Sequence, residues 1–160
     1  MGVLTNDPSL PSHNPNATVF NTHDVLSLEA TVSSIIIDSG CCNDHDMTEL
    51  DLSSMKSVAT LEIGDYSLCC AKSVVLVGLD CLESVTIGVN AFKAKDGSFT
   101  LKQCRALKEV RIGRYSFINY SVCEIDDVPS LTTLEIGDLH PIEESLCFKS
   151  ASLELKSRVW

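Results

Sequence analysis

At 160 residues, the chain has the length of one domain and is long enough to bury a sizeable core. Its net charge of −10 argues against nucleic-acid or anionic-membrane partners, because both are negatively charged and favour clusters of Lys and Arg. Aromatic residues are few, so we expect a core of Leu, Ile and Val, and no apolar run is long enough to predict a membrane span.

The first 24 residues differ in composition from the rest of the chain. They carry three of the five prolines among Asn, Ser, Thr and His, without any periodic apolar pattern. We therefore predict a flexible N-terminal arm over 1–24 and a folded domain over 25–160. The chain does not begin with the basic start and apolar segment of a secretory signal. The expected location is cytoplasmic, where the eight cysteines would stay reduced.

From residue 32 onward a short phrase recurs. Its clearest copy, LKEVRIGRYSF, occupies residues 107–117. The equivalent glycines of four copies stand 24, 25 and 24 residues apart, at Gly64, Gly88, Gly113 and Gly137. A fixed period in this range indicates stacked structural repeats. Residues 32–38 have the same apolar spacing with Asp38 at the glycine position, and we interpret them as an atypical first repeat.

Each repeat contains two short steps in which apolar and other residues alternate, and this period of two predicts strands with one buried face. The buried residues expected in the first strand ladder are Leu61 and Ile63, Val85 and Ile87, Val110 and Ile112, and Leu134 and Ile136. Those expected in the second ladder are Leu50 and Leu52, Val74 and Leu76, Phe99 and Leu101, and Cys123 and Ile125. The glycine after each first-ladder strand is expected to allow a positive φ, and the residue four positions later to return to the core.

One repeat is too small to bury its own apolar residues, so the copies must stack, with each strand paired in parallel to its counterpart in the next coil. The predicted fold is a β-rich repeat solenoid with parallel strand ladders and about five coils of 24–25 residues. Residues 153–156 are the expected last strand, after a frayed stretch that follows Gly137. End coils without a clear polar cap leave self-association through the ends open.

The repeated phrases resemble leucine-rich repeats, in which L-x-x-L-x-L recurs every 20–29 residues. The resemblance is carried by the apolar-x-Ile steps that begin at Leu61, Val85, Val110 and Leu134. The Ile-Gly-x-x-Ser-Phe phrase is similar to the BspA-like subclass, over residues 32–140. Two alternating phrases and the lack of an Asn ladder depart from the family pattern. The resemblance implies a protein-binding scaffold or, as in some BspA-like proteins, a surface adhesion module.

The outward positions of the first ladder form the predicted partner-binding surface. Parallel stacking places these side chains next to one another as a flat polar strip, the kind of extended surface through which repeat proteins bind partners. The predicted binding residues are Thr60, Glu62, Ser84, Thr86, Glu109, Arg111, Thr133 and Glu135. The competing interpretation is a solvated sheet face without a partner, because no outward aromatic residue is available as an anchor.

Two cysteine pairs are the strongest hint of a metal site. Cys41 and Cys42 lie close to His45 in the sequence, and Cys69 and Cys70 follow one repeat later. A structural zinc site needs well-spaced ligand pairs, and adjacent cysteines are a poor chelate, so we expect one cysteine of each pair in the core and no metal.

Other chemistry has little support in the sequence. The single cysteines expected on buried columns are Cys104 and Cys123. No catalytic-triad spacing, P-loop, dinucleotide-binding or metalloprotease motif is present. We therefore predict a non-catalytic scaffold without a cofactor that binds another protein. The alternatives are an adhesion module or a degenerate fragment of a longer repeat array.

Overall fold

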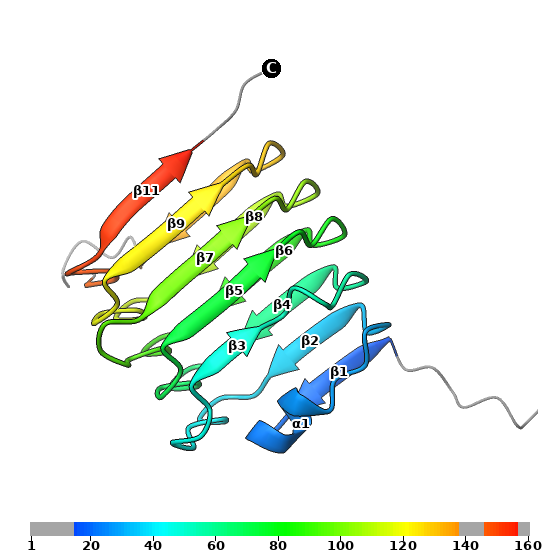
Figure 1. Cartoon of the computed structure of the whole chain (residues 1–160), viewed down its shortest axis with the longest axis horizontal. Coiled ribbons are helices and arrows are strands. Elements are labelled where there is room, and N and C mark those ends of the chain that lie inside the picture. The colour runs from blue at the N-terminus through cyan, green and yellow to red at the C-terminus, as the bar shows by residue number, and fades with distance from the viewer. Residues whose placement is uncertain (1–14, 138–145, 157–160) are drawn as a thin grey trace, which may run out of the picture.

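The computed structural model describes residues 15–137 and 146–156, which form a coil of short parallel strands (Figure 1). The chain passes alternately through two sheets. Sheet A runs in the order β1 (Asn16–Val19), β2 (Ser34–Ile37), β4 (Thr60–Ile63), β6 (Ser84–Ile87), β8 (Glu109–Ile112) and β10 (Thr133–Ile136). Sheet B runs in the order β11 (Ser152–Lys156), β9 (Val122–Asp126), β7 (Ser98–Lys102), β5 (Ser73–Val77) and β3 (Glu49–Asp51). The predicted β-rich solenoid with parallel strand ladders is confirmed, and it has about four turns where about five coils were expected.

Both predicted ladders are present, and every pairing is parallel and in register. In sheet A, Val110 of β8 lies opposite Val85 of β6 and Leu134 of β10. The atypical first repeat follows the same rule, because Ile35 of β2 lies opposite Leu61 of β4. The predicted inward residues are buried except on β10, whose Leu134 and Ile136 are half-buried. Strand β10 is the last strand of its sheet among the described residues, so no further coil covers it.

The repeated glycines have a different role from the one expected. Among them only Gly137 has a positive φ, of 79°. At Gly113, by contrast, an added Cβ would lie 2.6 Å from the carbonyl carbon and oxygen of Gly88 in the preceding coil. These positions therefore need glycine because two backbones approach closely, which is the other use of that residue. The positive φ angles occur two and four residues later, on Tyr66 and Leu68, Asn90 and Phe92, and Tyr115 and Phe117.

The residue four positions after each glycine returns to the core, as predicted. Leu68, Phe92 and Phe117 are each 0 % exposed. The rings of Phe92 and Phe117 stack with centroids 4.7 Å apart, and Phe148 stacks on Phe117 at 4.8 Å. An aromatic column therefore runs inside the turns, parallel to the stacking direction of the coils, and offset stacking of this kind adds to the energy of burial.

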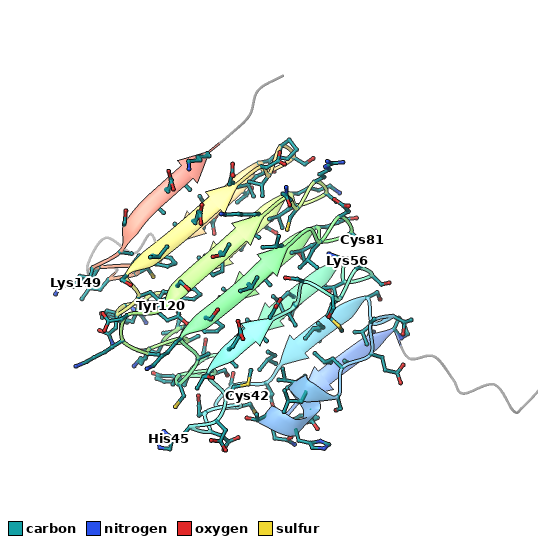
Figure 2. The ribbon with its side chains drawn as sticks, viewed as in Figure 1. Cys42, His45, Lys56, Cys81, Tyr120 and Lys149 are labelled. Carbon is teal, nitrogen blue, oxygen red and sulfur yellow. The ribbon has the colours of Figure 1, made fainter. Side chains whose placement is uncertain are left out.

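Tyr120 lies beside this column, at the end of the fold where β5, β7 and β9 begin (Figure 2). Its hydroxyl donates a 2.6 Å hydrogen bond to the carbonyl of Ala71, although the side chain is 0 % exposed. The ring crosses the intervening coil at Gly97, where an added Cβ would lie 2.6 Å from the ring. One side chain thus links coils that are not neighbours.

The N-terminal region corrects one sequence-based expectation. Residues 1–14 lie outside the described residues, but 15–24 are not a flexible arm. Strand β1 pairs with β2, and its Val19 is 0 % exposed. Helix α1 (Thr22–Leu26) follows, with the Asn21 side chain accepting a hydrogen bond from the backbone N–H of Asp24 as an N-cap. Because α1 lies between two successive sheet A strands, it takes the place that a sheet B strand has in later coils (Figure 1).

The other end of the fold carries the expected last strand. Strand β11 pairs in parallel with β9, and Leu153 lies opposite Cys123. Leu153 and Leu155 are 51 % and 55 % exposed, although they continue a buried column. Within the described part of the chain, α1 is too short to cross a membrane and no other helix could do so.

Candidate functional site: the outer face of sheet A

The predicted binding residues lie together on the outer face of sheet A. Alternation along each strand sends them outward, because the residues between them are buried on β4, β6 and β8 and half-buried on β10. Register then aligns them across β4, β6, β8 and β10 in two columns. One column consists of Thr60, Ser84, Glu109 and Thr133, and the other of Glu62, Thr86, Arg111 and Glu135. The structure thus brings all eight side chains onto one continuous face.

In the C-terminal half of this face, charges are paired within the protein itself. The Arg111 guanidinium donates to Glu109 on its own strand at 2.6 Å and also to Glu135 of the next strand. These hydrogen bonds, above all the one that Glu109 accepts, raise the pKa of Arg111 above its usual value. The three side chains are partly exposed, so solvent weakens the ion pairs. A partner that used this half would first have to break or share these contacts.

The N-terminal half of the face is more open. A shallow hollow of about 230 Å³ lies where β2, β4 and β6 end, and Glu62 and Thr86 are among the residues that line it. Ile36 of β2 stands directly beside Glu62 and is 37 % exposed. Glu62, Asp38 and Asp65 make the hollow acidic, and Ile36 gives it one apolar contact. This combination suits a partner with a basic and an apolar group.

Two features of this face were missed from the sequence. Ile36 belongs to the same column as Glu62, but its repeat has Asp38 at the glycine position and was not included in the binding surface. Placing that repeat in register with the others would have found it. The second feature is a row of hydroxyl groups, in which Thr60 Oγ1 donates to Ser34 Oγ at 2.8 Å. This contact ties β2 to β4 on the outer face.

The two cysteine pairs lie at one packed corner of the fold. Cys42 is 3 % exposed, whereas Cys41 is half-buried, as expected for a pair with one member in the core. The expectation was wrong for Cys69 and Cys70, because both are half-buried. Burial raises the pKa of the Cys42 thiol to about 11, which keeps it protonated. Among the described residues, no three His, Cys, Asp or Glu side chains converge as metal ligands would.

His45 contacts the second pair. Its Nδ1 lies 4.0 Å from Cys70 Sγ, and that thiol donates to the Asn43 carbonyl at 3.2 Å. The Asn43 side chain binds the backbone of Gly40 and Tyr66 and accepts from the N–H of Cys69. Asn43 therefore holds two successive turns together. Figure 2 shows Cys42 and His45 at this corner of the fold.

The single cysteines of the buried columns are placed as predicted. Cys104 and Cys123 are each 0 % exposed. Burial raises the pKa of both thiols, and that of Cys123 reaches about 12. Such thiols are poor nucleophiles and pack as small apolar side chains.

Comparison of the chain with protein-family models, with curated proteins and with solved structures finds no match.

Proposed function

We propose that the protein is a non-catalytic scaffold that binds another protein through the outer face of sheet A. The observation that carries the proposal is the alignment of eight outward side chains over a ladder whose inward residues are packed and in register. A parallel ladder presents such side chains at a fixed spacing of about 4.8 Å, so the surface is organised before a partner arrives. Less conformational entropy is then lost on binding.

Within this face we place the main contact at the hollow near Glu62, Thr86 and Ile36. Among the described residues that line the hollow there is no Lys or Arg, in contrast to the arginine between Glu109 and Glu135. The partner is expected to present Lys or Arg next to an apolar side chain. The resemblance of the repeats to BspA-like leucine-rich repeats supports a protein-binding role, because repeat proteins commonly bind through such extended surfaces.

Affinity purification with mass spectrometry tests the proposal. The test variant changes Glu62, Thr86, Arg111 and Glu135 to alanine together, which removes one column and leaves the inward residues intact. The matched control changes Thr100, Lys102 and Glu124 to alanine, because these lie on the outer side of sheet B. A protein captured by the wild type and the control but lost by the test variant would support this face. A partner retained by the test variant would show that the face is wrong.

The cytoplasmic location stays part of the proposal and separates it from the adhesion alternative. Cell fractionation with an antibody against the protein would measure it. Protein found only in the cytosol would exclude an adhesion module. Protein at the cell surface would favour adhesion over an intracellular scaffold.

A further inference from the structure

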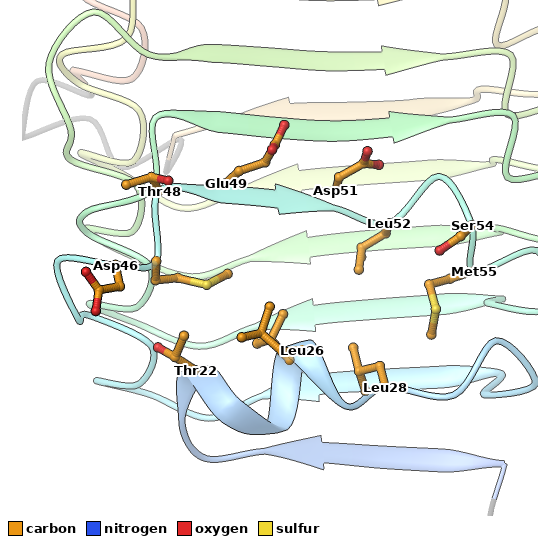
Figure 3. Close-up of a pocket in the computed structure, with 12 residues that line it drawn as sticks. Thr22, Leu26, Leu28, Asp46, Thr48, Glu49, Asp51, Leu52, Ser54 and Met55 are labelled. Carbon is orange, nitrogen blue, oxygen red and sulfur yellow. The ribbon is translucent and has the colours of Figure 1, made fainter.

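A groove separates helix α1 from strand β3 at the N-terminal end of the fold (Figure 3). Its volume is about 470 Å³, within the range of small-ligand and peptide sites. Thr22 lies at one end and Ser54 and Met55 at the other. It is separate from the hollow on sheet A, because the two have no lining residue in common.

The groove exists because a helix stands where a strand would otherwise lie. Strand β3 is the edge of sheet B, and the five-residue α1 has no buried residue. A helix has no free backbone groups along its side, so α1 cannot pair with the edge of β3 as a strand would. The edge therefore remains without a strand partner among the described residues.

The backbone of β3 is suited to accept another strand. On the β5 side, the carbonyl of Thr48 accepts a 2.7 Å hydrogen bond from the N–H of Lys72. On the same side, the N–H of Leu52 donates a 3.1 Å hydrogen bond to the carbonyl of Val75. In a parallel pair, alternate residues direct their backbone groups to opposite sides. The N–H and C=O groups of Glu49 and Asp51 therefore point towards the groove. A free edge of this kind is what peptides use in β-strand addition.

The side chains around the groove define what such a strand would carry. The apolar lining residues are Val25, Leu26, Leu28, Met47, Leu52 and Met55. Leu26 is 79 % exposed and forms the accessible apolar wall, whereas Met47 and Met55 are 2 % and 5 % exposed and form the packed floor of the groove. The charged lining residues are all acidic and all exposed: Asp46, Glu49 and Asp51. The site is apolar inside and acidic at its rim.

We propose that this groove binds an extended peptide of a partner protein, added to β3 as a strand, with an apolar side chain in the groove and Lys or Arg beside it. Backbone hydrogen bonds to Glu49 and Asp51 would give affinity, and the acidic rim would select the charge. A second copy of this chain is a poorer occupant, because each copy carries a net charge of −10 and the copies repel one another. This site is independent of the sheet A face.

Fluorescence polarisation with the full chain tests the proposal. The probes are a labelled peptide Lys-Val-Leu-Val-Lys, its counterpart Glu-Val-Leu-Val-Glu, and two N-methylated forms of the basic peptide, one methylated at the odd and one at the even positions. The basic peptide is expected to bind, with an affinity that falls as salt concentration rises. The acidic peptide and the N-methylated peptide that has lost the pairing N–H groups should not bind. Equal binding of the basic and acidic peptides, or binding that survives both N-methylation patterns, would overturn the proposal.

Variants of exposed residues locate the site without risk to the core. Glu49→Lys should weaken binding of the basic peptide by about tenfold or more. Its control Asp80→Lys makes the same charge change at an exposed residue that does not line the groove, and should not weaken binding. Leu26→Asp should also weaken binding, whereas Leu155→Asp, an exposed leucine at the other end, should not. If either variant and its control weakened peptide binding equally, the proposed location of the site would be wrong.

Sedimentation of the wild type and of Leu26→Asp tests the other candidate occupant of the groove, a second copy of the chain. A monomer in both proteins agrees with the proposal. A dimer that Leu26→Asp dissociates would instead assign the groove to a second copy of the chain.

Discussion

Replacing Gly113 by alanine is expected to destabilise the solenoid strongly, although the residue does not have a positive φ. The added Cβ would lie 2.6 Å from the carbonyl carbon and oxygen of Gly88 and 2.8 Å from the N–H nitrogen of Val89. All three atoms belong to the backbone of the preceding coil. No side-chain rotation can relieve the contact, so the two coils have to move apart.

The size of the effect follows from these distances. Reaching an ordinary contact of 3.4 Å requires a movement of about 0.8 Å, in a ladder whose strands are about 4.8 Å apart. Overpacking a rigid site typically costs about 1–3 kcal/mol. Alanine also restricts the unfolded chain, which offsets about 0.4–1 kcal/mol. We therefore expect a net loss of about 1–2 kcal/mol, or a melting temperature lower by about 2–8 °C.

Gly40→Ala is the matched control. Gly40 has a φ of 73°, but nothing lies within 4 Å of an added Cβ. Its cost is therefore backbone strain of about 1–2 kcal/mol, which the same restriction of the unfolded chain reduces to about 1 kcal/mol or less. Urea denaturation followed by circular dichroism measures both variants. A loss for Gly113→Ala no larger than that for Gly40→Ala would refute the argument that the repeated glycines serve close approach of the coils.

Three further predictions test the core. Ile112→Asp should unfold the coils, because Ile112 is 2 % exposed and an unpaired carboxylate there is costly; an unchanged melting curve would contradict its inward placement. Tyr120→Phe should lower the free energy of unfolding by about 1–2 kcal/mol, because the Ala71 carbonyl loses its buried donor; urea titration giving no loss would show that this bond contributes nothing. Burial raises the pKa of Cys123 from 9.0 to about 12, so the native protein keeps a proton that the unfolded chain releases. This stabilisation is complete below about pH 9 and is lost as the pH rises to about 12, so stability measured over that range should fall less steeply in Cys123→Val. Equal slopes of stability against pH in the wild type and Cys123→Val would contradict the raised pKa of the Cys123 thiol.

The strand columns were predictable because two periods coincide in this sequence. Alternation fixes which side chains of a step such as Val110-Arg111-Ile112 point inward, and the repeat spacing fixes which strands are neighbours. The placement of the outward residues follows from the same alternation along each strand. The pairing of Arg111 with Glu109 and Glu135 was also within reach, because the register makes them neighbours.

The reason for the repeated glycines was not predictable from one sequence. A glycine that permits a positive φ and a glycine that permits two backbones to approach look the same in the chain. Strand β1 was missed because Val19 is its only buried residue, which is too little for a periodic pattern. Helix α1 has five residues and none buried, so it carries no amphipathic signal either. The groove beside β3 is lined on one side by α1 and therefore could not be foreseen.

The hydrogen bond from Tyr120 to Ala71 affects how the coils would come apart under force. Most contacts in a solenoid join a coil to its immediate neighbour, so pulling on the ends would peel coils off singly. Tyr120 and Ala71 are 49 residues apart, about twice the repeat, so this bond spans three coils. Extension would then meet one step in which several coils release together, longer than a step of one repeat. This side chain would act as a mechanical clamp in an otherwise stepwise structure.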